Sequence, residues 1–374
     1  MRILIDCFKL VKGHGSSIGI YNHARNLVYH LAQYRDASGD DTIASSEIVV
    51  IGNRENRADF SIDGVRFVEI KNGDPRNNLT CVLWELFAVS EAAKREQADR
   101  IIFPRGYTAV DHPVPDIAII HDLIPLYYER HHRGAMNRFK RAYINYRLKQ
   151  SAKTCRHIIT DSEASRQDLK RYYHIDDKKI SVIHCGVNRT GTKNSVANSN
   201  KNGYICALTS GFPHKNAKGI FRSYEAYCRI SKDPLPMTVL GTDSVQGLEL
   251  PEDVHARITC MKYIPDDNLF YSIIANSRMF LFLSLIEGFG LPPLEAMQLG
   301  VPVICSNTYS LPEVVGDAAE LVDPQDPEAV AQVMVRLAGD ERRRKELVKR
   351  GKERIKRFAW NEIAGRYWRT IVAV

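Results

Sequence analysis

The sequence has no paired cysteine motif. Its eight cysteines are scattered singly, and no C-x-x-C pair occurs, which excludes a zinc ribbon and a dithiol redox motif. Most of them stand in apolar runs such as Val303-Ile304-Cys305, where cysteine serves as a small hydrophobic side chain. This usage is typical of a reducing, cytoplasmic compartment.

Long apolar runs are also missing. No stretch approaches the roughly 18 apolar residues that a membrane-spanning helix needs. The first residues, Met1 to Asp6, form an apolar run that is too short for the core of a signal peptide and favours a buried strand. Any attachment to a membrane is therefore expected to be peripheral.

The charge balance is basic, with 52 Lys and Arg against 44 Asp and Glu and a net charge of +8. This excess favours acidic partners, which include nucleic acid, anionic lipid and phosphate-bearing substrates. The 374 residues are about twice the common domain size, which predicts two domains, each with its own core.

Short β-branched runs alternate with longer helical patterns, which predicts an α/β protein with parallel sheets. The expected strands are Arg2–Cys7, Glu47–Ile51, Ile117–Ile120, His157–Thr160, Ile180–Ile183, Tyr204–Leu208, Met237–Leu240, Ile258–Met261, Met279–Leu283 and Val301–Cys305. Between the fifth and the sixth lies a polar stretch rich in Asn, Ser, Thr and Gly, residues 188–203. Such a stretch indicates a linker, and we place the domain boundary near residue 190.

The strongest local signal is S-L-I-E-G-F-G-L-P-P-L-E-A-M over residues 284–297, which follows an apolar strand and opens into a helix. Gly288 and Gly290 let the backbone approach a ligand, and the new helix adds its positive end, so the block predicts a phosphate cradle. Glu287 and Glu295 frame it, and carboxylates accept hydrogen bonds from vicinal hydroxyls such as those of a ribose or a hexose. The alternative is a plain turn followed by a surface glutamate.

This block, with G-V-P-V-I-C-S over residues 300–306 and L-P-E-V-V-G-D-A-A over residues 311–319, resembles the donor site of the retaining glycosyltransferases of family 4. The resemblance extends over nearly the whole chain. It implies the GT-B fold, in which two Rossmann-like domains have parallel sheets that face a central cleft. Residues 1–190 would bind the acceptor and residues 191–357 the nucleotide-sugar, with the closing helix 358–374 packed back on the first domain.

The same resemblance assigns the donor-site residues. It makes His121 and Glu287 the predicted catalytic residues, with His121, after a strand, directed at the donor sugar and diphosphate. Within G-F-P-H-K-N, residues 211–216, it assigns the diphosphate mainly to Lys215, because His214 stands where many members carry Arg. The predicted donor-binding residues are Lys215, Asn216, Gly288, Phe289, Gly290, Leu291 and Glu295.

The glycine-rich first loop is similar to the family's loop that lines the cleft near acceptor and diphosphate. Its residues are Gly15, Ser16, Ser17 and Gly19. A plain strand-to-helix turn is the alternative.

The D-x-D triplet, with which many nucleotide-sugar enzymes hold a divalent cation, is absent. We therefore expect no metal and no other cofactor, with Lys215 and the loop amides meeting the charge of the leaving diphosphate. The resemblance implies retention, with an oxocarbenium-like transition state and attack by the acceptor hydroxyl from the diphosphate's own face.

From Arg130 to Arg156 the chain carries nine cations and no Asp or Glu, with aromatic residues interleaved at helical spacing. Three interpretations remain open: an anionic membrane surface, a solvated basic face with a buried aromatic side, and nucleic acid. We favour peripheral attachment to the inner face of the cell membrane and expect no nucleic acid, because no motif of a nucleic-acid module appears.

The predicted function is transfer of a hexose from a nucleotide-sugar to a glycan or a lipid-diphosphate-linked acceptor in surface-polysaccharide assembly. The resemblance to bacterial enzymes of that process favours GDP-mannose, with UDP- and dTDP-sugars left open. The alternatives are a nucleotide-sugar epimerase, a non-catalytic partner subunit of a glycan-assembly complex, and a dinucleotide-dependent oxidoreductase. The last would need G-x-G-x-x-G and a downstream acid, which the first loop lacks.

Overall fold

The computed structural model describes residues 1–12, 18–188, 203–245 and 247–374. It divides into two compact units, one of residues Met1–Gly186 with Trp360–Val374 and one of residues Val187–Ala359. The domain boundary expected near residue 190 lies outside the described residues. In the structure, the first unit ends at Gly186 and the second begins at Val187. The closing segment joins the first unit from Trp360 onward.

The first unit is built on a seven-stranded, all-parallel sheet with the order β3-β2-β1-β4-β5-β6-β7. Its strands are β1 (Arg2–Asp6), β2 (Glu47–Gly52), β3 (Val65–Glu69), β4 (Arg100–Phe103), β5 (Asp116–Ile119), β6 (His157–Thr160) and β7 (Ile180–Val182). Strands β3 and β4 were missed from the sequence. The order reverses between β1 and β4, and ligands of open α/β sheets bind outside the carboxyl ends of the strands at such a point.

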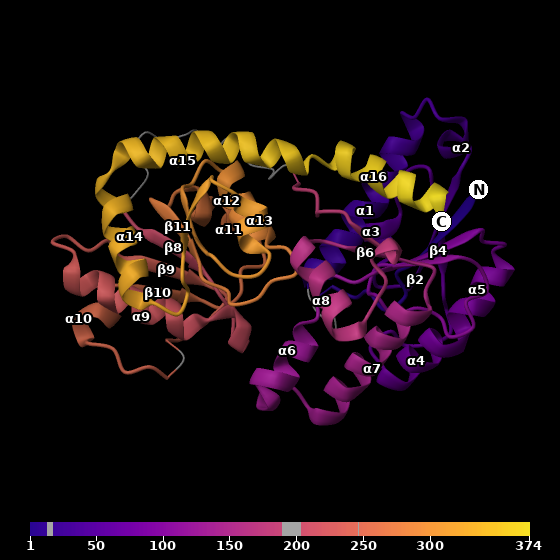
Figure 1. Ribbon diagram of the computed structural model, residues 1–374, viewed down its shortest axis with the longest axis horizontal. Helices are drawn as coiled ribbons and strands as arrows, with labels where there is room; N and C mark the ends of the chain where they lie inside the picture. Colours follow the sequence, from indigo (N-terminus) through magenta and orange to yellow (C-terminus); the bar gives the residue numbers. More distant parts are fainter. Residues whose placement is uncertain (13–17, 189–202, 246) are drawn as a thin grey trace. The chain divides into compact units, whose positions relative to one another are not determined.

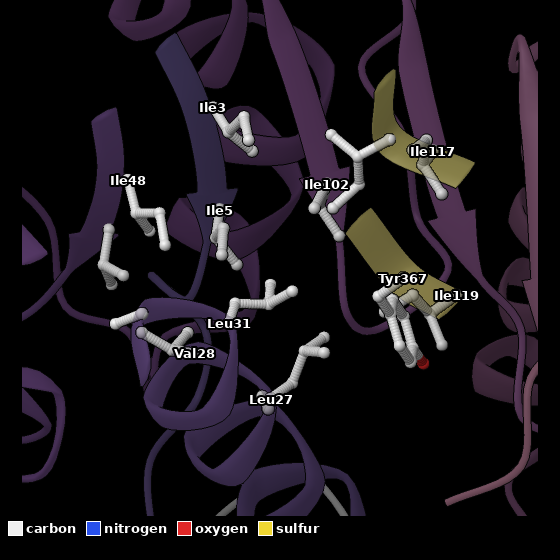
Figure 2. Packing of buried hydrophobic residues seen from close by; sticks show 14 of the residues in the cluster. Ile3, Ile5, Leu27, Val28, Leu31, Ile48, Ile102, Ile117, Ile119 and Tyr367 are labelled. Atoms are coloured by element: carbon white, nitrogen blue, oxygen red, sulfur yellow. The ribbon is translucent and has the colours of Figure 1, made fainter. Parts of the chain in front are cut away.

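Two layers of helices cover this sheet. Helices α1 (Ile18–Asp36) and α16 (Trp360–Ala373) pack on one face, where Leu27, Leu31 and Tyr367 meet the strand residues Ile5 and Ile119 in one buried cluster (Figure 2). The remaining helices are α2 (Asp41–Ala44), α3 (Arg57–Phe60), α4 (Asn78–Leu83), the π-helix η1 (Trp84–Ala88), α5 (Val89–Arg95), α6 (Ile124–His131), η2 (Arg133–Ala135), α7 (Arg138–Thr154), α8 (Glu163–Tyr173) and η3 (Asp177–Lys179).

The second unit contains a six-stranded parallel sheet with the order β10-β9-β8-β11-β12-β13. Its strands are β8 (Ile205–Leu208), β9 (Met237–Leu240), β10 (Ile258–Met261), β11 (Met279–Phe282), β12 (Val303–Ser306) and β13 (Ala319–Val322). Strand β13 was not predicted. The strand order reverses between β8 and β11, which places the expected ligand position of this unit at their carboxyl ends.

The helices of the second unit surround its sheet (Figure 1). They are η4 (Pro213–Lys215), α9 (Ala217–Ile230), α10 (Glu252–His255), α11 (Asp267–Ala275), α12 (Leu291–Gln298), α13 (Leu311–Val315), α14 (Pro327–Gly339), α15 (Glu341–Arg354) and η5 (Ile355–Phe358). The buried face of α9, with Phe221 and Tyr224, packs with Met334 of α14 on strand residues such as Leu281. The buried residues of these helices and of the strands thus form one core.

The basic segment from Arg130 to Arg156 differs from its expected form. It is broken into the end of α6, the short turn η2 and the helix α7. Arg147 is fully buried and donates to the carbonyl oxygen of Thr108 at 2.7 Å. The interleaved aromatic residues do not form one buried side, because Phe139 and Tyr146 are exposed.

No helix in residues 1–12, 18–188, 203–245 and 247–374 has the length and apolar character needed to cross a membrane.

Candidate functional site

The second unit brings Lys215 and Glu287 together at the switch point of its sheet. Lys215 follows β8 and Glu287 follows β11, and these strands are hydrogen-bonded neighbours. The Lys215 Nζ atom lies 2.6 Å from Glu287 Oε1, and both side chains are largely buried. A lysine and a carboxylate predicted from separate motifs therefore form one ion pair where a ligand is expected.

Asn216 fixes the position of Lys215. Its backbone adopts φ 54°, and its side-chain oxygen accepts from the amide of Gly219 at 3.2 Å, which caps the start of α9. Its amide group donates to the carbonyl oxygens of Leu283 and Pro324, each at 3.0 Å. These contacts join the start of α9 to the segments that follow β11 and β13, so Asn216 helps to position Lys215. The predicted contact of Asn216 with the donor stays a prediction.

Two hydrogen bonds from Ser310 hold the loop from Glu287 to Gly290 in place. The Ser310 hydroxyl is fully buried and lies 2.7 Å from the carbonyl oxygen of Glu287 and 2.8 Å from that of Phe289. Gly290 adopts φ 109°, a conformation that L side chains rarely adopt. With these carbonyl oxygens hydrogen-bonded to Ser310, the loop keeps one shape; Ser310 was not among the predicted site residues.

Helix α12 begins at Leu291, directly after this loop. Pro292 and Pro293 occupy its first turn and carry no backbone N–H, so they are not hydrogen-bond donors. Amide donors for an anion must come from Gly288, Phe289, Gly290 and Leu291, which are the loop residues that the sequence predicted. The dipole of the helix adds favourable potential at the same end.

Glu295 lies one turn inside α12, with its carboxylate turned to α11. The Tyr271 hydroxyl donates to Glu295 Oε1 at 3.2 Å. Burial raises the pKa of Glu295 to about 7, against the lowering effect of this hydrogen bond. A buried carboxylate with one hydroxyl partner retains acceptor capacity for further hydroxyl groups, which suits the predicted contact with a ribose.

In the first unit, His121 follows β5 at the carboxyl edge of the sheet. Its Nδ1 atom lies 2.6 Å from Asp161 Oδ2, and its Nε2 atom lies 2.9 Å from the carbonyl oxygen of Pro104. Both neighbours are acceptors, so both ring nitrogens must carry protons. Burial alone would lower the pKa of His121, but the Asp161 carboxylate and the Pro104 carbonyl raise it to about 9. His121 is therefore a fixed imidazolium whose two donors are already engaged.

A second histidine, His23, contacts the ring of His121. The rings of His23 and His121 meet edge to face, with centroids 5.1 Å apart, and His23 Nε2 lies 3.2 Å from the Tyr367 hydroxyl of α16. Burial lowers the pKa of His23 to about 4, so this ring is neutral at pH 7. The pair thus places one cationic and one neutral imidazole side by side.

A polar cluster at the carboxyl ends of β1 and β4 was missed by the sequence analysis. Lys9 Nζ lies 2.5 Å from Glu85 Oε1, and Trp84 donates its indole N–H to Asp6 at 3.0 Å. Asp6, Lys9, Glu85 and Arg105 line one small cavity. Burial raises the pKa of Asp6 to about 6. Glu85 belongs to the π-helix η1, an element frequently found at functional sites, but no local motif in the sequence marks it.

The predicted first-loop residues divide between two regions. Gly15, Ser16 and Ser17 lie outside the described residues, and Gly19 lies in the first turn of α1. Within the described part of the chain, no group of three or more His, Cys, Asp or Glu side chains is placed to hold a metal ion.

Solved structures identify the class of fold. The chain superposes on sucrose-phosphate synthase from Thermosynechococcus elongatus with a TM-score of 0.74 at 20% identity, over 100% of this chain and 99% of that one. Such neighbours show two parallel-sheet α/β domains of the GT-B type, as the sequence predicted.

Family models match both halves. Residues 22–190 match Glycosyltransferase Family 4, and residues 188–354 match Glycosyl transferases group 1. The chain belongs to the family 4 glycosyltransferases, which confirms the predicted resemblance.

Two curated relatives are similar over part of their length. The O-antigen chain mannosyltransferase B of Escherichia coli is 30% identical over 232 residues, which span 58% of this chain and 61% of that protein. The O-antigen chain mannosyltransferase RfbU of Salmonella typhimurium is 28% identical over 211 residues, 55% of this chain and 56% of the relative. The matched region thus spans less than two thirds of each relative.

Proposed function

We propose that this protein transfers mannose from GDP-mannose to a glycan or a lipid-diphosphate-linked acceptor in the assembly of a cell-surface polysaccharide. The observation that carries the proposal is the Lys215–Glu287 ion pair at the β8–β11 switch point, beside the loop that leads into α12. The names of the two O-antigen mannosyltransferases support the choice of sugar.

The ion pair prepares the site for the donor. Without a ligand, Glu287 neutralises Lys215 at 2.6 Å. When the nucleotide-sugar binds, the diphosphate takes the lysine as its counter-ion, and Glu287 accepts hydrogen bonds from sugar hydroxyls instead. The loop amides from Gly288 to Leu291 meet the remaining phosphate oxygens, and Glu295 accepts from the ribose.

The chemical step follows from these contacts. The bond from the sugar's anomeric carbon to the diphosphate oxygen breaks, the acceptor oxygen bonds to that carbon on the same face, and the acceptor proton passes to the diphosphate. Retention results, and the loop amides and Lys215 stabilise the leaving group. The His121 imidazolium supplies a fixed positive charge at the edge of its own sheet. Anomeric NMR coupling of the product tests this step, and an inverted product contradicts it.

The reaction is expected to need no metal or other cofactor. The cationic Lys215 and the donor amides of the loop provide the charge stabilisation that a divalent ion provides elsewhere. Activity measured in excess chelator should equal activity without it. Complete loss that is restored by added Mg²⁺ would contradict this expectation.

Thermal stabilisation by GDP, UDP and dTDP tests the proposed site. A nucleotide at a hundred times its dissociation constant adds about 2.7 kcal/mol to the folded state. We expect GDP to stabilise the wild type and the Glu295→Ala variant to lose that shift. Stabilisation by UDP alone would reassign the donor, and no stabilisation by any of the three would favour a non-catalytic partner subunit.

A transfer assay distinguishes a glycosyltransferase from a nucleotide-sugar epimerase. Labelled GDP-mannose is incubated with and without a mannose-containing acceptor, and the products are separated. Transfer that requires the acceptor supports the proposal, whereas a changed nucleotide-sugar formed without any acceptor supports an epimerase.

The site of action is proposed to be the cytoplasm, at the inner face of the cell membrane. The seven exposed cations of the segment from Arg130 to Arg156 support this location, because each cation near an anionic leaflet contributes about 1 kcal/mol.

A further inference from the structure

Three large apolar side chains are exposed along one line of the first unit. Leu79, Leu83 and Phe87 are 68%, 48% and 63% exposed, and they follow one another at intervals of four residues through α4 and η1. That spacing keeps them on one side of the helical segment. We call these three residues the apolar stripe.

Helix α7 also presents apolar rings to solvent. Phe139 is 75% exposed and Tyr146 is 66% exposed; seven residues apart, they lie on the same side of the helix. Lys149 and Lys153 continue this side and are exposed as well. The opposite side of α7, with Leu148 and Ala152, is buried against the sheet.

The apolar stripe and the exposed side of α7 face the same way. Leu4 and Ile101 are register partners, as are Phe103 and Ala118, and paired residues point to the same face of a sheet. The helical segment α4–η1–α5 packs on Leu4, Ile101 and Phe103, and α7 packs on Ala118. Both therefore cover one face of the sheet and turn their outer sides away from it (Figure 1).

A hydrogen bond fixes the two elements to each other. The Tyr143 hydroxyl of α7 donates to Glu85 Oε2 of η1 at 3.0 Å. Five exposed apolar side chains thus occupy one layer of a single unit, whereas single exposed apolar residues are ordinary on a protein surface and a group of them marks an interaction site.

The α7 side of this layer is mainly basic, and Glu129, which accepts a hydrogen bond from Asn145 of α7, is an exposed acid beside it. Seven of the nine cations between Arg130 and Arg156 are exposed, the exceptions being Arg141 and Arg147. Arg138 lies over the ring of Phe139, with its guanidinium carbon 5.3 Å from the ring centre. Glu91, four residues beyond Phe87, is the next exposed residue along the stripe and pairs with Lys94.

We propose that the outer layer formed by α4, η1 and α7 docks on an anionic lipid bilayer, with the apolar stripe, Phe139 and Tyr146 inserted among the lipids and the flanking cations at the headgroups. This combination of an apolar side and a basic rim is what binds helices into the plane of a membrane interface. The inference specifies the surface for the proposed peripheral location, but it depends on no property of the donor site.

Sedimentation of the full chain with vesicles tests the surface. One set of vesicles contains phosphatidylglycerol and phosphatidylcholine, and the other contains phosphatidylcholine alone. We expect the wild type to sediment with the anionic set at low salt, and Leu79→Ser/Leu83→Ser/Phe87→Ser to lower its partition coefficient about tenfold or more. The matched control is Tyr263→Ser/Leu269→Ser, which removes side chains of 74% and 49% exposure from the second unit and should change nothing.

A second variant separates charge from insertion. Lys140→Gln/Lys149→Gln/Lys153→Gln removes three exposed cations and should lower partition about a hundredfold, at about fivefold for each cation. Phe87→Trp with brominated lipids reports depth, because the native Trp84, Trp360 and Trp368 are buried. Quenching of the new indole is expected only with anionic vesicles.

Several results would overturn the proposal. The wild type could fail to sediment, or the stripe variant could sediment as well as the control pair. Alternatively, light scattering could show that the wild type forms a dimer that the stripe variant lacks, which would assign the layer to a second copy of the chain. Nucleotide-dependent thermal stabilisation of the same variants, measured without vesicles, shows separately whether the fold and the donor site are intact.

Discussion

Glu295 should make the stability of this protein depend on pH. Its carboxyl group is buried in α12 with the Tyr271 hydroxyl as its hydrogen-bond donor, and burial raises its pKa from 4.5 to about 7. The folded state therefore holds this proton more tightly than the unfolded state. The stabilising contribution is complete below about pH 4.5 and is lost as the pH rises through about 7.

The size of the pKa rise sets the size of the change in unfolding free energy. A change of one pH unit in a pKa corresponds to about 1.36 kcal/mol, so the rise from 4.5 to about 7 corresponds to about 3 kcal/mol. Glu295→Gln keeps the size and the acceptor oxygen but removes the titration. Relative to wild type, the variant should gain about 3 kcal/mol in unfolding free energy between pH 4.5 and pH 8.

Urea unfolding followed by circular dichroism at several pH values measures this difference. Tyr271→Phe is a useful second variant, because without the hydroxyl the pKa of Glu295 should rise further and the pH dependence should move to higher pH. A constant difference between wild type and Glu295→Gln from pH 5 to pH 8 would refute the buried, protonated carboxyl group.

Donor binding should lower the raised pKa of Glu295. Ribose hydroxyls that donate to Glu295 stabilise its ionised form, so its pKa should fall when a nucleoside diphosphate binds. Calorimetry in buffers of different ionisation enthalpy should then detect proton release at pH 6.5 in wild type and none from this group in Glu295→Gln. Equal proton release in both would place the ribose elsewhere.

Three further predictions concern the other site residues. Lys215→Ala should weaken nucleoside diphosphate binding at least tenfold by calorimetry, because a charge-assisted hydrogen bond of about 1.5–3 kcal/mol is lost; unchanged affinity would place the diphosphate elsewhere. Asp161→Asn should lower the pKa of His121 from about 9, and with it the alkaline limit of the activity profile; an unchanged ring titration by NMR would contradict the pairing. Gly290→Ala should lose about 1–3 kcal/mol of stability from φ 109°, whereas Gly211→Ala, where a Cβ has open space, should not.

Most of the fold was predictable from local pattern. The ten expected strands all occur, because buried parallel strands are short β-branched runs bounded by polar loops. Of the three missed strands, β4 has that pattern and was overlooked, whereas β3 and β13 lack it. β3 is only partly buried along its length, and β13 carries Glu320, whose carboxylate pairs with Arg336 and Arg343 instead of facing water alone. Only the sheet neighbours show that these segments are extended.

The donor loop was predictable for the same reason. Glu287, Gly290 and the start of α12 lie within a few residues, and the loop needs glycine where its backbone adopts positive φ. The residues of this segment that would bind the ligand are nearly consecutive, so the sequence alone predicts the class of ligand. Residues 188–354 match the model of Glycosyl transferases group 1, which is compatible with that prediction.

Only the tertiary structure determined which side chains meet. The Asp161 carboxylate, 40 residues away, accepts a hydrogen bond from His121 and keeps it protonated. Ser310 binds two carbonyl oxygens of the proposed donor loop that lie 21 and 23 residues before it, and Tyr143 joins Glu85 across 58 residues. Burial, and with it the pKa of each carboxyl and imidazole group, depends on such distant neighbours. The sequence by itself determined the kinds of residue and the period of each element; the packing of the strands decided which of those residues face one another, which are exposed and which hold a proton.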